Sequence, residues 1–251
     1  MTSPSEPRTP RLYHVATPGA AAIFAALGIA TIYAVQIMLL KSGAGPLLAS
    51  IAGDVVAGAA LLSAARINRI DLGLRWPGAR FAIAGLLVGA SAWMVALQIV
   101  EWVQPTEQQG PLGQVVLHGS LWPLLVGLGL LPAFTEELVF RGMLARGLAT
   151  YLRPWVAVAI SGVVFAAYHL DPAQMLGVLP LALALGLLAI RSGSVVPGMI
   201  AHLTNNVIAL VLSRDELPAV SRVLGARPAV TLIVAVVVLA AGVALTAKAP
   251  A

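Results

Sequence analysis

The sequence predicts an all-α protein, a polytopic bundle of about eight transmembrane helices. Of its 251 residues, 59% are hydrophobic and only 10% are charged, whereas an average soluble domain is roughly 45–50% apolar and about 25% charged. Several apolar stretches also approach the roughly 20 residues that cross a bilayer as a helix. This apolar composition excludes a soluble globular enzyme. Because the chain has no cysteine, a disulfide-stapled secreted module is excluded as well.

Eight apolar segments are the expected transmembrane helices. The first, residues 20–40, exceeds the apolar core of a signal peptide, and we therefore expect it to remain as an anchor. The others are 46–65, 81–100, 121–140, 154–170, 172–190, 194–212 and 229–247. Segment 101–120 is too polar to span and is flanked by tryptophans, which favour the headgroup region. It is predicted to be an interfacial loop.

These segments give a four-part organisation. Residues 1–18 are polar and rich in proline, which predicts a disordered cytoplasmic tail. Residues 19–120 hold the first helices and the interfacial loop, and residues 121–212 form the expected catalytic core. Residues 213–251 supply a loop and the last helix.

Loop charges predict the orientation in the membrane. Thirteen of the fifteen basic residues are arginine, and loops 66–80 and 141–153 are rich in them, which favours the cytoplasm for both loops. Eight crossings then place the N- and C-termini in the cytoplasm, although loop 213–228 also carries arginine on the opposite side. The net charge of +5 fits anchoring to anionic membrane lipid better than nucleic-acid binding. The composition fits a bacterial inner membrane, and the sequence leaves the oligomeric state open.

Ionisable residues inside the apolar runs are the candidates for function, because each costs roughly 2.5–3.5 kcal/mol at the centre of a spanning helix. Glu137 and Arg141 stand four residues apart and can form an ion pair on one helix face. Glu136 points about 100° away and is left to project into a cavity. A cluster of this kind also commonly ends a helix at the membrane surface, so alone it does not decide between structure and function.

Two histidines extend the pattern on later helices. His169 closes one apolar run, and His202 lies four residues before Asn206 on one face of another. Each alone is explained by helix packing or a hydrogen bond, and Asp54 is expected to be a packing or cavity residue. Together, two imidazoles and a spare carboxylate are a donor set suited to a catalytic zinc with a bound water.

At these positions the sequence resembles the CPBP family of intramembrane proteases, also called ABI proteins, which includes CAAX proteases and bacteriocin-processing enzymes. The shared motifs are EExxxR at Glu136–Arg141, FxxxH at Phe165–His169 and HxxxN at His202–Asn206. The resemblance implies an eight-helix bundle in which Glu136 activates water and Asn206 helps to stabilise the oxyanion. It implies that His169 and His202 bind the metal or water, with Glu137 and Arg141 orienting the site. Glu137 or Asn206 remains as a possible third zinc ligand.

The expected activity is that of a metal-dependent endopeptidase acting on a membrane-associated or lipidated peptide or protein. Nothing in the sequence indicates a prenyl site. Two other classes stay open: a non-catalytic immunity or scaffold protein of the same fold, and a proton-coupled transporter that uses Asp54 in an ion relay.

Overall fold

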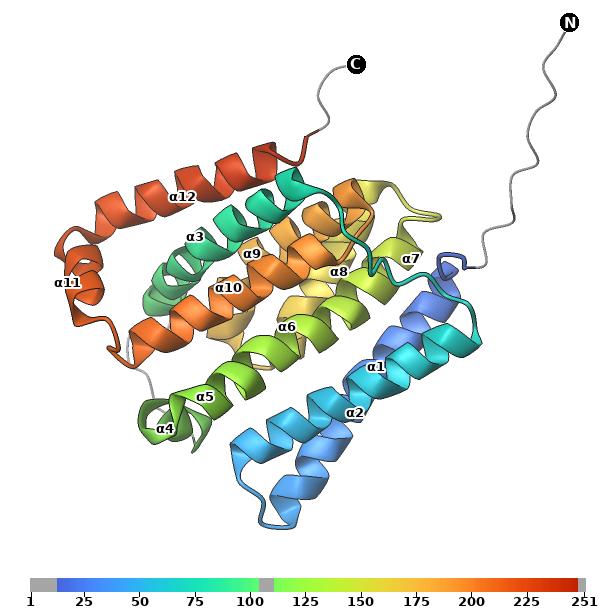
Figure 1. The fold of residues 1–251 in the computed structure, drawn as a ribbon, viewed down its shortest axis with the longest axis horizontal. Coiled ribbons are helices and arrows are strands. Elements are labelled where there is room, and N and C mark those ends of the chain that lie inside the picture. Colours follow the sequence, from blue (N-terminus) through green and yellow to red (C-terminus); the bar gives the residue numbers. More distant parts are fainter. Residues whose placement is uncertain (1–12, 104–110, 248–251) are drawn as a thin grey trace, which may run out of the picture.

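The computed structural model describes residues 13–103 and 111–247, and within them every regular element is a helix (Figure 1). The predicted all-α fold is confirmed. Each predicted span corresponds to a helix: α1 (Pro18–Lys41), α2 (Pro46–Ile67), α3 (Ala79–Val103), the continuous helix Leu121–Leu148, α8 (Pro154–Tyr168), α9 (Pro172–Ser192), α10 (Val196–Ser213) and α12 (Pro228–Ala244).

By length and apolar composition, six or seven of the described helices qualify as membrane spans. In the described part of the chain, six helices are long and apolar enough to cross a membrane. A seventh appears if α11 (Pro218–Ala226) and α12, which are bent by 98° at their junction, count as one span. The 15 residues of α8 rise only about 22 Å at 1.5 Å per residue, which is short of the roughly 30 Å hydrocarbon core. About eight is therefore an approximate count.

The helix Leu121–Leu148 is irregular where it carries the glutamates. It consists of α5 (Leu121–Leu124), the π-helical stretch η1 (Leu125–Leu130), α6 (Leu131–Glu136), a second π-helical stretch η2 (Glu137–Ala145), and α7 (Arg146–Leu148). Pro132 has no backbone N–H, so the carbonyl of Leu128 loses its α-helical donor. Stretches of π-helix occur frequently at functional sites.

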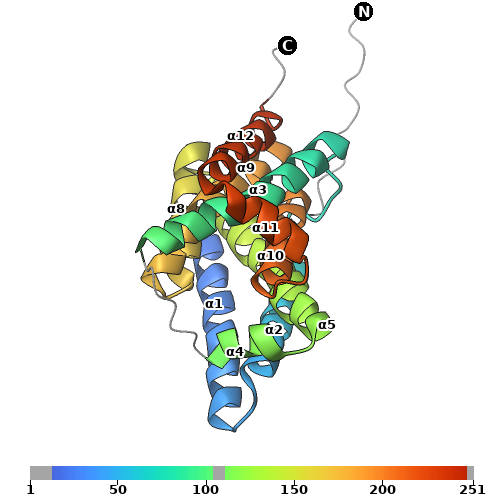
Figure 2. The ribbon, with the colours of Figure 1, turned by 90° about the vertical axis from the view of Figure 1, so that its left-hand side faces the viewer.

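This helix runs through the middle of the bundle. The pair α1 and α2 lies on one side of it, and α3, α10 and α12 lie on the other, as Figures 1 and 2 show from two directions. Its η2 stretch packs against α1, α8 and α9, while α3 packs against α9, α10 and α12. The glutamate motif is consequently buried among helices from both halves of the chain.

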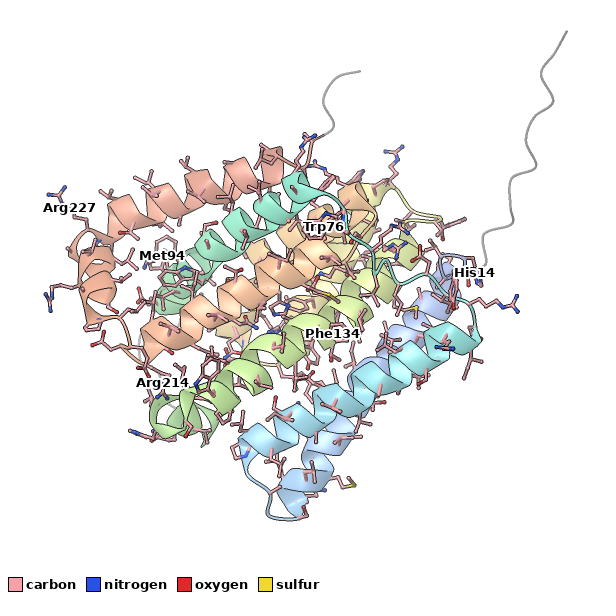
Figure 3. All side chains as sticks on the ribbon, viewed as in Figure 1. His14, Trp76, Met94, Phe134, Arg214 and Arg227 are labelled. Carbon is pink, nitrogen blue, oxygen red and sulfur yellow. The ribbon has the colours of Figure 1, made fainter. Side chains whose placement is uncertain are left out.

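Arg80, Arg146 and Arg191, from three different segments, lie at one end of the bundle (Figure 1). Arg146 bonds Asp71 at 2.9 Å, Arg191 donates to Thr246 at 2.7 Å, and Arg80 donates to the carbonyl of Leu245 at 2.5 Å. Figure 3 shows the loop of Arg214 and Arg227 at the far end from His14. Alternate loops thus lie at opposite ends, as the predicted crossings require, while the sidedness itself stays a prediction.

Two segments differ from the sequence expectation. Of the tail predicted to be disordered over 1–18, residues 1–12 lie outside the described residues. The rest is ordered: the His14 amide donates to Arg69 at 2.9 Å, its carbonyl accepts from Asp71 at 2.7 Å, and α1 begins at Pro18. These hydrogen bonds join backbone groups of segments far apart in the sequence, so no pattern of side chains predicts them.

The interfacial loop predicted over 101–120 is wrong in part. The helix α3 continues to Val103, and α4 (Pro111–His118) forms a further helix, while residues 104–110 lie outside the described residues. Eight residues containing a glycine are too few to give a clear helical periodicity.

Candidate active site

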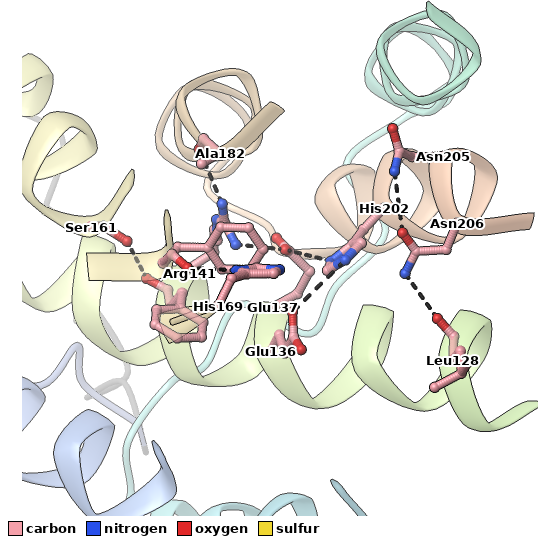
Figure 4. Close-up of polar contacts among 12 residues, drawn as sticks. Leu128, Glu136, Glu137, Arg141, Ser161, His169, Ala182, His202, Asn205 and Asn206 are labelled. Carbon is pink, nitrogen blue, oxygen red and sulfur yellow. Dashed lines mark hydrogen bonds and ion pairs between the residues drawn. The ribbon is translucent and has the colours of Figure 1, made fainter. Parts of the chain in front are cut away.

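Glu137 and Arg141 form a fully buried ion pair at the centre of the site (Figure 4). Arg141 Nη1 lies 2.9 Å from Glu137 Oε1, and its Nη2 donates to the carbonyl of Ala182 on α9 at 3.0 Å. The guanidinium carbon also stands 4.2 Å from the centre of the Phe165 ring, within cation–π range. The i,i+4 contact expected from the sequence is present, and it ties η2 to α8 and α9.

His202 connects this pair to Glu136. Its Nδ1 lies 3.2 Å from Glu137 Oε1, and its Nε2 faces Glu136 Oε2 at 3.8 Å. Because the Glu137 carboxylate is paired with Arg141, it acts as an acceptor, so Nδ1 donates to it; in the neutral imidazole Nε2 then carries the lone pair on the side that faces Glu136. A separation of 3.8 Å exceeds a direct hydrogen bond, so Glu136 and His202 face each other without bonding directly.

A glycine permits this arrangement of the helices. Gly198 lies one turn before His202 on α10, and a Cβ at that position would stand 2.5 Å from Glu137 Oε2. Any larger residue would displace the carboxylate that holds His202. Glycine therefore allows α10 to approach η2 closely enough for the contact with His202.

His169 occupies the end of α8, where it caps the helix. Its Nδ1 is 3.0 Å from the carbonyl of Phe165, which only accepts, so Nε2 again presents the lone pair. The Phe165 ring packs edge-on against both imidazoles, with centroids 5.1 Å from His169 and 5.8 Å from His202. The two predicted histidines thus flank one aromatic ring.

Asn206 lies one turn beyond His202 and forms a hydrogen bond to the irregular helix Leu121–Leu148. Its Nδ2 donates at 3.1 Å to the carbonyl of Leu128, the group that Pro132 leaves without its α-helical donor. An amide nitrogen carries two N–H bonds, so a second donor remains for a ligand. Its Oδ1 accepts from Asn205 at 3.2 Å.

Three further polar residues border Glu136, and none of them belongs to the three sequence motifs. Tyr168 lies beside Glu136, and the hydroxyl of Tyr33 donates to the carbonyl of Tyr168. Asp54 on α2 is 2% exposed, and its Oδ1 has no hydrogen-bond partner. A tyrosine in an apolar helix carries no special signal, whereas the charge of Asp54 did mark it as unusual.

The imidazole and carboxylate groups at the site are of the types that bind zinc. Two imidazoles present Nε2 lone pairs while a backbone carbonyl and a carboxylate hold their Nδ1 atoms, which is the usual support of zinc-bound histidine. Glu137 Oε2 is buried without a hydrogen-bond partner and is thus an acceptor that the protein leaves unused. No group of three His, Cys, Asp or Glu side chains is gathered as a metal site in residues 13–103 and 111–247. Zinc binding and its third ligand stay predictions.

The fold and the site define a polytopic membrane protein with a buried carboxylate–histidine centre. Residues 118–208 match the family model described as Rce1-like, type II CAAX prenyl endopeptidase, which confirms the resemblance over that segment. The family implies a protease, and with the apolar helices it indicates an integral multi-pass membrane protein. Neither the curated proteins nor the solved structures that were searched contain a match to the chain.

Proposed function

We propose that this protein is an intramembrane metal-dependent endopeptidase that cleaves a peptide bond in a membrane-associated or lipidated substrate. The observation that carries the proposal is that His202 Nε2 faces Glu136 Oε2 at 3.8 Å. Glu137 and Arg141 fix that imidazole, so the two reacting groups are held in a set orientation before substrate arrives.

In the proposed reaction, Glu136 accepts a proton from water as the water oxygen adds to the substrate carbonyl. The unused N–H of Asn206 donates to the oxyanion that forms. Glu136 then returns the proton to the nitrogen of the leaving amine as the carbon–nitrogen bond breaks. His169 and His202 would hold zinc, which when bound lowers the pKa of its water towards about 7.

The burial of the site supports hydrolysis by a single water molecule that is shielded from bulk solvent. Glu136 is 7% exposed and His202 is 4% exposed, so bulk water is largely excluded and the local electrostatic interactions are strong. Membrane lipid forms the surroundings of the bundle in this proposal. The substrate would therefore reach the site as an apolar peptide rather than as a folded soluble protein.

The test combines metal analysis with peptide cleavage by detergent-purified protein. The parent is expected to hold about one zinc per chain, in line with a single catalytic site, and the His169→Ala/His202→Ala double variant to lose it. Cleavage of a panel of synthetic apolar peptides is measured by mass spectrometry for the parent and for Glu136→Gln.

Glu136→Gln keeps the shape of the side chain but removes the base, so cleavage should fall by at least about 100-fold. The matched control is Glu216→Gln in the loop after α10, which should cleave like the parent. Equal cleavage by the parent and Glu136→Gln would reject the catalytic role and favour the non-catalytic alternative.

A further inference from the structure

A cavity of about 790 Å³ lies at the end of the bundle where α2 leads into α3. Its walls come from the segment before α1, the last turns of α2 and the loop 68–78 between α2 and α3. Three charged side chains, Arg66, Asp71 and Arg75, line it together with Tyr13. The rest of the lining is apolar and consists of Leu62, Ala65, Ile70, Leu72 and Leu74. The predicted site residues do not line this cavity, so it is separate from the candidate active site.

The one acid that lines the cavity is already paired within the protein. Asp71 Oδ2 accepts from Arg146 and from Arg75, each at 2.9 Å, and Asp71 Oδ1 accepts from the Gly73 amide at 2.8 Å. Arg146 is only 7% exposed and also donates to the Asp71 carbonyl, so this buried guanidinium neutralises the carboxylate. The cavity therefore keeps the positive charge of Arg66 and Arg75.

Both of these arginines have N–H groups left for a ligand. Within residues 13–103 and 111–247, the Arg66 side chain makes no hydrogen bond or ion pair. The Arg75 side chain is 53% exposed, and its bond to Asp71 uses one N–H of Nη1, whereas a guanidinium has five. Arginine N–H groups in pairs are the usual partners of phosphate oxygens, so the free donors fit a phosphate group.

The position of Arg66 along α2 indicates that the phosphate belongs to a lipid. The 22 residues of α2 rise about 33 Å at 1.5 Å per residue, close to the roughly 30 Å hydrocarbon core. Arg66 in its last turn thus lies at the level of the headgroups, and Leu62 lies one turn towards the bilayer centre on the same helix face. Nearby, Ile67, Leu74 and Trp76 are 80%, 47% and 65% exposed. A dissolved ion gains nothing from these apolar side chains, whereas acyl chains bury them.

We infer that this cavity binds the headgroup of an anionic phospholipid, with Arg66 and Arg75 donating to its phosphate and Leu62 contacting the start of an acyl chain. A zwitterionic headgroup would bring its own cation beside the two arginines, and this like charge disfavours it. The surface of a cytoplasmic leaflet is negatively charged, and loop 66–80 is predicted to lie on that side. This binding does not depend on the proposed peptidase activity.

A bound lipid at this position also stabilises the contact between the loop and the catalytic helix. Asp71 joins Arg75 in the cavity to Arg146, and Arg146 directly follows the η2 stretch that carries Glu137. Because ligand binding to the folded state alone raises its stability, the lipid is expected to raise the melting temperature.

The test titrates detergent-purified protein separately with phosphatidylglycerol, phosphatidylcholine and inorganic phosphate. Melting temperature and native mass spectrometry report on binding. Arg66→Gln removes one charge without breaking a side-chain bond in the described part of the chain, so its fold should survive, and Arg66→Gln/Arg75→Gln removes both charges. The matched control, Arg222→Gln/Arg227→Gln, removes two exposed arginines in and after α11.

The parent and the Arg222→Gln/Arg227→Gln control should bind phosphatidylglycerol saturably, with a rise in melting temperature that phosphatidylcholine and inorganic phosphate do not produce. Arg66→Gln should weaken the apparent Kd for phosphatidylglycerol by about tenfold, the effect of losing one charge-assisted hydrogen bond. The double variant Arg66→Gln/Arg75→Gln should lose the saturable rise.

Equal affinity for phosphatidylglycerol in the parent and both cavity variants would overturn the inference, and so would equal binding of phosphatidylcholine. The same rise with inorganic phosphate alone would show a site for a dissolved anion and not for a lipid. An equal loss of binding in the Arg222→Gln/Arg227→Gln control would show that net charge, and not this cavity, holds the lipid. None of these results bears on peptide cleavage, so the proposed function is tested independently.

Discussion

The buried ion pair of Glu137 and Arg141 makes the most direct prediction about stability. Both side chains have no exposed surface, so replacing Glu137 by leucine leaves the guanidinium with only the Ala182 carbonyl and the Phe165 ring. Removing one partner of a buried pair costs about 3–5 kcal/mol, whereas replacing both by apolar residues is often close to neutral. We therefore expect Glu137→Leu and Arg141→Leu each to cost about 3–5 kcal/mol, and the double variant no more than either one.

The measurement is unfolding in mixed micelles with a rising fraction of sodium dodecyl sulfate, followed by circular dichroism. The control is the same cycle on Arg214 and Glu216, whose 3.0 Å pair lies in a more exposed loop and should contribute at most about 1 kcal/mol. If the loss in free energy of unfolding of the double variant equalled the sum of the losses in Glu137→Leu and Arg141→Leu, the two residues would not be coupled, and the reasoning would fail.

Two further predictions concern Asp71, at one end of the bundle, and Gly198, which contacts Glu137 in the site. Partial burial raises the pKa of Asp71, but hydrogen bonds, led by that from Arg146, lower it overall to about 2 from the usual 3.8. This stabilisation is fully present above about pH 4 and is lost as the pH falls through about 2. Asp71→Asn should therefore cost about 1 kcal/mol at pH 7 after allowance for solvent screening, and its melting curve should approach that of the parent near pH 2. Gly198→Ala should cost about 1–3 kcal/mol in the same melting assay, because its Cβ would meet Glu137. The matched Gly225→Ala, with no atom within 4 Å of the added carbon, should not lower the melting temperature.

The composition was sufficient to predict the class of fold because apolar length alone defines spanning helices. Every predicted span coincides with a helix. The differences occur where other forces act: α8 ends early at His169, and α4 is too short to show a clear period. The ordered contact of His14 with Asp71 joins backbone groups far apart in the sequence, and backbone hydrogen bonds of this kind have no side-chain signature.

Within the site, contacts four residues apart could be predicted, and contacts between helices could not. Helical spacing gave the pair of Glu137 with Arg141. The approach of His202 to Glu137 depends on Gly198. The bond from Asn206 on α10 to the Leu128 carbonyl depends on Pro132, which lies in the same helix as Leu128 and not in α10. Each requires the relative position of two helices, which a single sequence does not specify.

The first two helices belong to the surroundings of the site, although they lie outside the segment matched by the family model. Thr135 donates to the Asp54 carbonyl at 3.1 Å, and this bond joins α2 to the turn before Glu136. Tyr33 on α1 donates to the Tyr168 carbonyl, and Tyr168 in turn lies beside Glu136. The position of Glu136 therefore depends on both halves of the bundle. An unpaired buried carboxyl at Asp54 is costly to retain, and its location beside Glu136 shows that the polar environment of this site extends into α2.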